Sequence, residues 1–325
     1  DKNTLVSYPN GRTDASYTIP ATTQNVQPAA FTTVPALTSV KVESGNDYLK
    51  SVDGVLYDAQ QTTLLFYPAQ PTREKAKEIV LKEGITTLAP YALTFHTALE
   101  KITLPQSLKE IKDNALCYNP KLTQLNLEEG SHPALTFIGE SEFKYCRSLD
   151  ELPYFSMLKT ISKNAFSTCT QLSTIHIPAG CSIEKGAFEK CLNLHDVYAY
   201  DDTPATIDPN TFTDIVFINE ARLIIPLKSG QLYSTQTGWN VFAGHVLEEL
   251  PTGVVSVENM SVALKNTLDG VAIDGLQAGL RYALYTANGV LVTQGVTTTA
   301  PLTLTLQKGL HVLKIEKVGT LKCMK

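Results

Sequence analysis

One segment of this sequence recurs along the chain. Residues 161–178 read Ile-Ser-Lys-Asn-Ala-Phe-Ser-Thr-Cys-Thr-Gln-Leu-Ser-Thr-Ile-His-Ile-Pro, and close copies start at Ile138 and Ile183. Weaker copies start at Val26, Leu88 and Ile111, and a decayed one at Ile207. From Leu88 onward, successive starts lie 23, 27, 23, 22 and 24 residues apart. This spacing is too short for a pair of helices and suits one strand with a short returning turn.

The copies keep their apolar residues in register. An aliphatic residue opens each copy, and further apolar residues follow 5, 11 and 14 positions later; in the copy from Ile161 these are Phe166, Leu172 and Ile175. A unit of this size cannot bury four apolar positions by itself, so the copies must stack on one another. The sequence therefore predicts a solenoid.

An insertion interrupts the register near residues 46–80. It contains Asp53-Gly-Val-Leu-Tyr-Asp58 and Thr63-Leu-Leu-Phe-Tyr-Pro68, separated by a polar stretch typical of a turn. We expect a hairpin that decorates the stack. The chain start, Thr4-Leu-Val-Ser-Tyr-Pro9, repeats the second half of this insertion and is expected to be half of an equivalent hairpin.

The composition changes from Pro251 onward, where Val, Thr and Gly replace the repeat pattern. Two alternating runs flank Asn288-Gly289, a strong signal for a type I′ hairpin. Six or seven short strands are expected in this region. We predict that residues 249–325 form a small antiparallel β-sandwich.

The repeat pattern Ile-x-x-x-Ala-Phe-x-x-Cys-x-x-Leu-x-x-Ile-x-Ile-Pro resembles the BspA-like leucine-rich repeats of bacterial surface proteins. The resemblance covers roughly residues 1–248 and implies a β-rich, mixed α/β, right-handed leucine-rich-repeat solenoid. It also implies a C-terminal cap at 219–248, where Leu223-Ile-Ile-Pro226 precedes Tyr233, Trp239 and Phe242. Residues 249–325 resemble the C-terminal sorting domains of secreted Bacteroidetes proteins.

Charge and hydropathy argue against nucleic acid and a membrane span. Lys and Arg number 27 against 32 Asp and Glu, a net charge of −5 with no basic block, so we expect no nucleic-acid partner. No run of about 18 apolar residues predicts a membrane span. The chain begins at Asp1 without Met, and we expect an upstream segment such as a removed export signal.

No catalytic or cofactor motif stands out. The sequence contains no H-E-x-x-H, G-x-S-x-G, G-x-G-x-x-G or C-x-x-C pattern. Cys146, Cys169 and Cys191 share one column of the repeat, which allows a metal or disulfide interpretation. Other copies hold Val34, His96 and Asn119 there, so we favour buried packing and predict no catalytic residue, cofactor or metal.

The strand of each copy is expected to turn alternate side chains away from the core, which makes that sheet face the candidate ligand surface. The positions 13 residues after each opening residue include Lys101, Gln124, Thr174 and Asp196. The positions 15 residues after it include Lys41, Thr103, Asn126, His176, Tyr198 and Arg222, and Tyr200 lies two residues further on. Tyr198 and Tyr200 are placed to stack on a sugar or clasp a peptide. The alternative is that these are ordinary solvated strand residues.

One copy departs from the pattern at Leu152-Pro-Tyr-Phe155, with Pro inside the expected strand. Tyr154 and Phe155 are either a local rearrangement of packing, which we favour, or an exposed aromatic pair.

These observations favour a secreted or cell-surface, outer-membrane-associated binding or adhesion protein that catalyses no reaction. It would be a monomer and contact host, matrix, protein or glycan ligands. Two alternatives remain: a structural spacer for a missing upstream domain, or a hydrolase acting on glycans or peptides.

Overall fold

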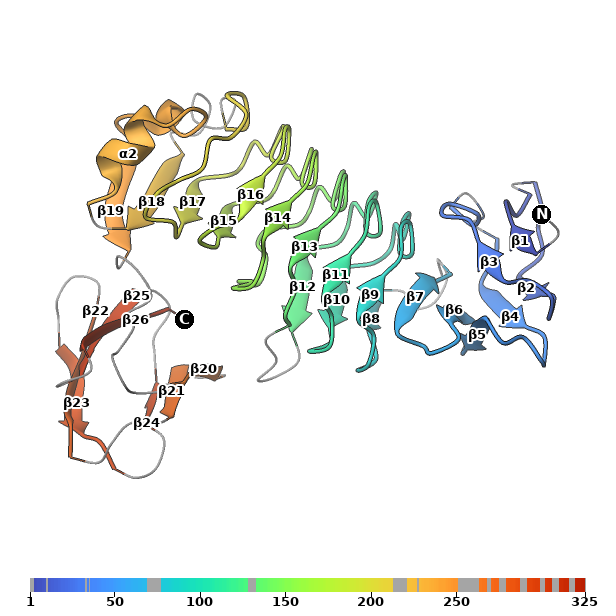
Figure 1. Ribbon diagram of the computed structural model, residues 1–325, viewed down its shortest axis with the longest axis horizontal. Coiled ribbons are helices and arrows are strands. Elements are labelled where there is room, and N and C mark those ends of the chain that lie inside the picture. Colours follow the sequence, from blue (N-terminus) through green and yellow to red (C-terminus); the bar gives the residue numbers. More distant parts are fainter. Residues whose placement is uncertain are drawn as a thin grey trace. The chain divides into compact units, whose positions relative to one another are not determined.

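The computed structural model describes residues 3–9, 11–32, 34, 36–68, 77–127, 133–212, 221–226, 228–250, 263–267, 270–274, 279–286, 291–298, 302–305, 310–315 and 319–324. The chain divides into two compact units, each described by itself below. The first comprises Asp1–Ile225 with Ser229–Leu247, and the second comprises Pro226–Lys228 with Glu248–Lys325. Most of the first unit is a stack of coils that follow one another in sequence order (Figure 1).

Most coils of the first unit carry two short strands, which pair in parallel with the corresponding strands of neighbouring coils (Figure 1). The longer strands have three to five residues and are β2 (Ser16–Ile19), β4 (Ser39–Val42), β8 (Glu78–Val80), β10 (Lys101–Leu104), β12 (Gln124–Leu127), β15 (Thr174–Ile177), β17 (Asp196–Ala199) and β18 (Arg222–Pro226). They belong to three separate sheets, and β4, β10, β12, β15 and β17 lie at the predicted place in the repeat. A second set, which the sequence did not predict, has two-residue strands that end on the opening aliphatic residue: β3 (Asn25–Val26), β9 (Thr87–Leu88), β11 (Glu110–Ile111), β13 (Phe137–Ile138), β14 (Thr160–Ile161) and β16 (Ser182–Ile183). All of these except β3 pair in one parallel ladder.

The predicted apolar columns form the core. In the coil that begins at Ile161, the side chains of Phe166, Leu172 and Ile175 are all buried, and the corresponding residues of the neighbouring coils are buried with them. The phenylalanines of four successive coils lie one above another, with centroids 5.2–5.5 Å apart from Phe143 through Phe212. The prediction of a stacked β-solenoid is confirmed.

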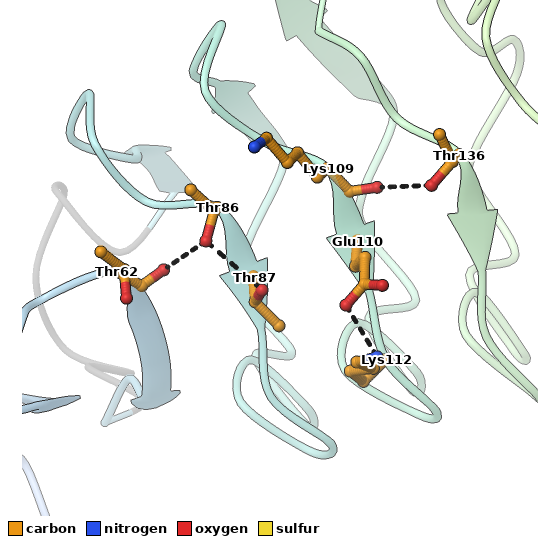
Figure 2. A network of polar contacts seen from close by, with 7 residues as sticks. All are labelled: Thr62, Thr86, Thr87, Lys109, Glu110, Lys112 and Thr136. Carbon is orange, nitrogen blue, oxygen red and sulfur yellow. Dashed lines mark hydrogen bonds and ion pairs between the residues drawn. The ribbon is translucent and has the colours of Figure 1, made fainter.

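Threonine hydroxyl groups add contacts between successive coils (Figure 2). The Thr86 hydroxyl donates to the carbonyl of Thr62 at 3.3 Å, and the Thr136 hydroxyl donates to the carbonyl of Lys109 at 3.5 Å. The backbone N–H of each threonine donates to the same carbonyl. These bonds hold the start of each two-residue strand to the coil before it.

The inserted segment forms a hairpin, but it is part of the sheet and does not merely decorate it. Strands β5 (Leu49–Val52), β6 (Val55–Asp58) and β7 (Thr63–Phe66) pair antiparallel, and β7 then pairs parallel with β9. At the chain start, β1 (Thr4–Leu5) pairs with β3 in the same way. The Tyr8 N–H donates to the Ala30 carbonyl just as the Tyr67 N–H donates to that of Ala92.

The last coil is followed by α2 (Gly230–Thr235), a single turn of 3-10 helix at Asn240–Phe242 and β19 (Val246–Leu250). Tyr233, Trp239 and Phe242 are buried and join the core through Phe212, which lies 5.5 Å from Trp239 and 5.3 Å from Phe242 between ring centroids. The aromatic side chains of this segment therefore cover the end of the stack. Helix is nearly absent from the described residues, so the mixed α/β part of the predicted class is not seen there.

The second unit contains two antiparallel sheets. One comprises β20 (Ala263–Thr267), β21 (Gly270–Asp274) and β24 (Leu302–Thr305), and the other β22 (Arg281–Thr286), β23 (Leu291–Val296), β25 (Leu310–Ile315) and β26 (Gly319–Met324). Ile273 and Leu304 of the first sheet and Leu284 and Leu313 of the second are buried. The expected β-sandwich stays a prediction, and Asn288-Gly289 lies outside the described residues.

Candidate functional site

The predicted ligand-face residues lie on the four-residue strands, with their apolar neighbours turned into the core as expected. The face is not continuous, however, because the strands form three separate sheets in the order β2-β4, β8-β10-β12 and β15-β17-β18-β19. Lys41 belongs to the first sheet and does not neighbour Lys101. Beyond β12, an isolated bridge between Gln124 and Glu151 is the one continuation of the ladder among the described residues, because Pro153 interrupts the strand of that coil.

The middle sheet holds four of the predicted residues in cross-strand pairs. Lys101 lies beside Gln124 and Thr103 beside Asn126. The Lys101 ammonium forms a 3.1 Å ion pair with Glu78 on β8. The positive charge of Lys101 is thus offset by a carboxylate on β8, a strand that lies outside the predicted repeat copies.

The third sheet brings aromatic side chains together. His176 lies beside Tyr198 in register on β15 and β17, and their rings stack with centroids 4.5 Å apart at 15°. Tyr200 follows β17, and its hydroxyl shares a 3.0 Å hydrogen bond with Nδ1 of His176. Tyr154 from the preceding coil completes the group, with its ring centroid 5.2 Å from that of Tyr200 and 5.9 Å from that of His176. We call Tyr154, His176, Tyr198 and Tyr200 the sheet-face aromatic cluster.

A carboxylate and a guanidinium group lie in the same sheet as this cluster, Asp196 on β17 and Arg222 on the neighbouring β18. Nε and Nη2 of Arg222 donate to Oδ1 and Oδ2 of Asp196 at 2.8 and 2.9 Å, a bidentate ion pair. The position of Arg222 was predicted incorrectly. It pairs with Asp196, while Ile224 lies beside Tyr198, so the last strand starts two residues later than the alignment of the copies placed it. Thr174 is the other neighbour of Asp196 across the sheet.

The electrostatics of the cluster favour neutral rings. Burial lowers the pKa of His176 to about 4, although the nearby Asp196 carboxylate opposes the change. Burial also raises the pKa of Tyr200, and Tyr154 and Tyr198 add to the increase. The cluster therefore presents uncharged aromatic surface at neutral pH. The Asp196–Arg222 ion pair lies in the same sheet.

At Leu152-Pro-Tyr-Phe155, one aromatic residue is repacked into the core and the other is exposed. Phe155 is 4% exposed and packs in the core, which is the rearrangement expected. Tyr154 is 46% exposed and reaches the aromatic residues of the following two coils. The sequence did not predict that Tyr154 contacts His176 and Tyr200. Tyr154 lies in the coil whose strand is interrupted, so the aligned repeat positions do not indicate where its side chain lies.

The cysteine column donates hydrogen bonds to the backbone. The thiol groups of Cys146, Cys169 and Cys191 donate to carbonyl oxygens of the preceding coil at 3.0–3.2 Å. Burial raises the pKa of all three thiols, so the thiolate form that metal binding and redox chemistry need is disfavoured. Within the described ranges, no group of three or more His, Cys, Asp or Glu side chains is arranged to hold a metal ion.

Among the described residues, no helix has the length and apolar character that crossing a bilayer requires.

Comparison with known proteins identifies the repeat. The family described as BspA type leucine rich repeat region matches residues 72–195 and 136–234, in six copies. No curated protein matches the sequence.

Several solved structures are similar to this chain. A leucine rich cell surface protein from Faecalibacterium prausnitzii is 18% identical over 69% of this chain and 51% of its own, with a TM-score of 0.46. The pneumococcal vaccine antigen PcpA is 17% identical over 73% of this chain and 55% of its own, with a TM-score of 0.45. A leucine rich repeat protein from T. pallidum is 20% identical over 53% of this chain and 77% of its own, with a TM-score of 0.42. This chain spans about half the length of the first two.

Proposed function

Because the chain belongs to the BspA-type leucine-rich repeat family, we propose that it is a secreted or cell-surface binding protein that catalyses no reaction. In this proposal it acts as a monomer outside the cytoplasm and holds an extracellular protein or glycan on its strand face. The C-terminal unit, residues 249–325, is proposed to be a β-sandwich of the sorting-domain type, which follows a right-handed solenoid.

The sheet-face aromatic cluster is the observation that carries this proposal. Tyr154, His176 and Tyr198 present apolar ring surface, and the Asp196–Arg222 pair joins β17, which carries Tyr198, to the neighbouring β18. Aromatic surface beside polar groups is the combination that ligand sites use for affinity and orientation. The parallel ladder fixes His176, Tyr198 and Asp196 before a ligand arrives, so little ordering entropy is lost on binding.

The proposal is tested by binding assays of the whole chain against extracellular-matrix proteins, mucins and glycans. We expect at least one of these ligands to bind, and its affinity to fall at least tenfold in Tyr154→Ala and Tyr198→Thr. Threonine is a suitable replacement because Thr103 occupies the equivalent strand position in β10. Asn126→Ala, on the same face but away from the cluster, serves as the control and should bind normally.

Two results contradict the proposal. One is the absence of binding to every member of the panel at high micromolar concentration. The other is binding that Tyr154→Ala and Tyr198→Thr leave unchanged while both variants unfold at the wild-type temperature.

A further inference from the structure

A second aromatic surface lies in the turns that connect the strands, away from the residues of the sheet-face aromatic cluster. Seven residues after its opening aliphatic residue, each of five coils has a backbone φ of +57° to +67°: Phe95, Tyr118, Tyr145, Thr168 and Lys190. Positive φ is unusual for bulky side chains. The strain is offset by hydrogen bonds, because the N–H of each of the first four donates to a carbonyl of the following coil at 2.7–3.3 Å.

Three coils in succession place an aromatic residue at this position. Phe95 and Tyr118 stack with centroids 4.9 Å apart, and Tyr118 and Tyr145 with centroids 4.7 Å apart. Phe95 is 41% exposed and Tyr118 is 40% exposed, so the edges of the row face solvent. The fold does not demand this row, because the next coil has Thr168 at the same backbone position with the same positive φ.

The row is cationic at one end. Nζ of Lys144 lies 5.8 Å from the ring centroid of Tyr145, and the Arg147 guanidinium carbon lies 5.5 Å from it. Lys144 and Arg147 form no ion pair with a carboxylate within the described part of the chain.

The corresponding turn segments of four coils lack acidic residues altogether. Residues 94–98, 117–121, 144–148 and 167–171 contain Lys121, Lys144 and Arg147 and no Asp or Glu, in a chain whose net charge is −5. We call these four segments the turn-edge band. Its local charge is opposite in sign to that of the whole chain, so it attracts an acidic partner and not a basic one.

We propose that the turn-edge band is a protein-docking surface for an acidic peptide segment, with Tyr118, Tyr145 and Arg147 as the anchoring residues. Tyr and Arg are the residue types that dominate binding energy at protein interfaces. A sugar ring would need an open aromatic face to lie on, and both faces of Tyr118 are covered by Phe95 and Tyr145. The exposed ring edges and cations suit carboxylate side chains and the peptide backbone instead.

The chain itself supplies a matched variant that should still fold. Lys144→Ser, Tyr145→Thr and Arg147→Thr together convert this turn into that of the next coil, where Ser167, Thr168 and Thr170 stand at the equivalent positions. Because Thr168 accepts the same positive φ, the triple variant keeps a backbone that the fold already uses.

The test screens a displayed library of random 12-residue peptides against the whole wild-type chain and against the triple variant. We expect peptides selected by the wild type alone to be rich in Asp and Glu. Their affinities, measured by fluorescence anisotropy, should fall at least tenfold in the triple variant and weaken as salt increases. They should be unchanged in Tyr154→Ala, so that this surface is distinguished from the sheet face.

Three outcomes would overturn the proposal. Selected peptides without acidic enrichment would remove the charge argument. Equal binding to the triple variant would move the site elsewhere. A heparin fragment that binds the wild type and not the triple variant, while no acidic peptide does, would show that the band recognises anionic glycans and not protein. Melting temperature and circular dichroism of the triple variant confirm that any loss is not unfolding.

Discussion

One buried column of the repeat accepts chemically different side chains, and five of them bond to a backbone carbonyl of the preceding coil. Nε2 of His96 lies 2.9 Å from the Tyr67 carbonyl oxygen, and Nδ2 of Asn119 donates to the Leu93 carbonyl at 3.0 Å. The cysteine thiols make the equivalent bonds in the later coils. The polar side chains at this position are buried groups that bond to the coil before it, whereas Val34 fills the position by apolar packing alone. The sequence shows the column, but not the carbonyl that explains it.

His96 makes stability depend on pH below neutrality. Burial lowers the pKa of His96 to about 4, against an ordinary value of ~6.5. The stability that the neutral ring contributes is present above about pH 6.5 and is lost as the pH falls toward 4, by about 3 kcal/mol in all. We expect His96→Asn, which copies Asn119, to reduce this loss when urea unfolding is measured from pH 7 to pH 4. The exposed His195→Asn serves as the control, and an equal pH dependence in wild type and His96→Asn would contradict the prediction.

Glu142 makes the protein less stable as the pH rises, the opposite of the dependence that His96 causes. It replaces the alanine found in neighbouring coils, is fully buried and accepts a 2.8 Å hydrogen bond from the Ala115 N–H at Oε2, while Oε1 has no partner among the described residues. Burial raises the pKa of Glu142 well above its usual value, despite these backbone hydrogen bonds. Its contribution is therefore complete below about pH 4.3 and is lost as the pH rises.

Replacing Glu142 should therefore help most at high pH. We expect Glu142→Gln to gain stability over wild type by about 1.4 kcal/mol per pH unit from pH ~4.5 upward, until the folded-state carboxyl ionises. Chemical denaturation at pH 4.5, 6 and 8 measures this, with the exposed Glu140→Gln as the matched control. A difference between Glu142→Gln and wild type that stays constant with pH would show that the buried carboxyl is not neutral.

At the scale of elements, the phenylalanine stack ties neighbouring coils together. Phe166 lies between Phe143 and Phe188, with centroid distances of 5.2 and 5.5 Å and rings within 3° of parallel. We expect Phe166→Ala to lower the free energy of unfolding by about 3–5 kcal/mol. Phe166→Leu should cost clearly less, because Leu93 and Leu116 fill the same position in earlier coils. If equilibrium denaturation shows equal losses for both variants, the ring stack has no special role.

The sequence predicted the elements that have a strong apolar period and missed those that depend on distant pairing. The columns through Phe166 and Leu172 were predictable because burial requires them in every coil. The two-residue strands were not, since strands this short leave no alternating pattern. Likewise, nothing local reveals that β7 pairs with β9, or that Arg222 lies beside Asp196. The sequence thus predicted which strands carry most of the candidate ligand residues, but not the contacts between their side chains.

At the scale of the whole molecule, the repeat unit has a core of its own. The large buried cluster runs from Val55 to Phe242 and the N-terminal one from Tyr8 to Phe66, and neither includes a residue from the described part of the second unit. We therefore expect residues 1–250 to fold alone and to melt within about 2 °C of the repeat transition in the full chain. Differential scanning calorimetry of both chains measures this, and a shorter chain that melts much earlier would show that the second unit supports the first.

The backbone hydrogen bonds between the turns of successive coils also determine how such a molecule can change in length. Each of these bonds joins a coil to an immediate neighbour, as in Tyr118 to Lys144 and Tyr145 to Ser167. A tandem duplication of residues 161–182 would bring its own donors, acceptors and ring, and would extend the unit by one strand spacing of ~4.8 Å. Each added coil would then increase the reach of the protein by a fixed increment, without any compensating substitution.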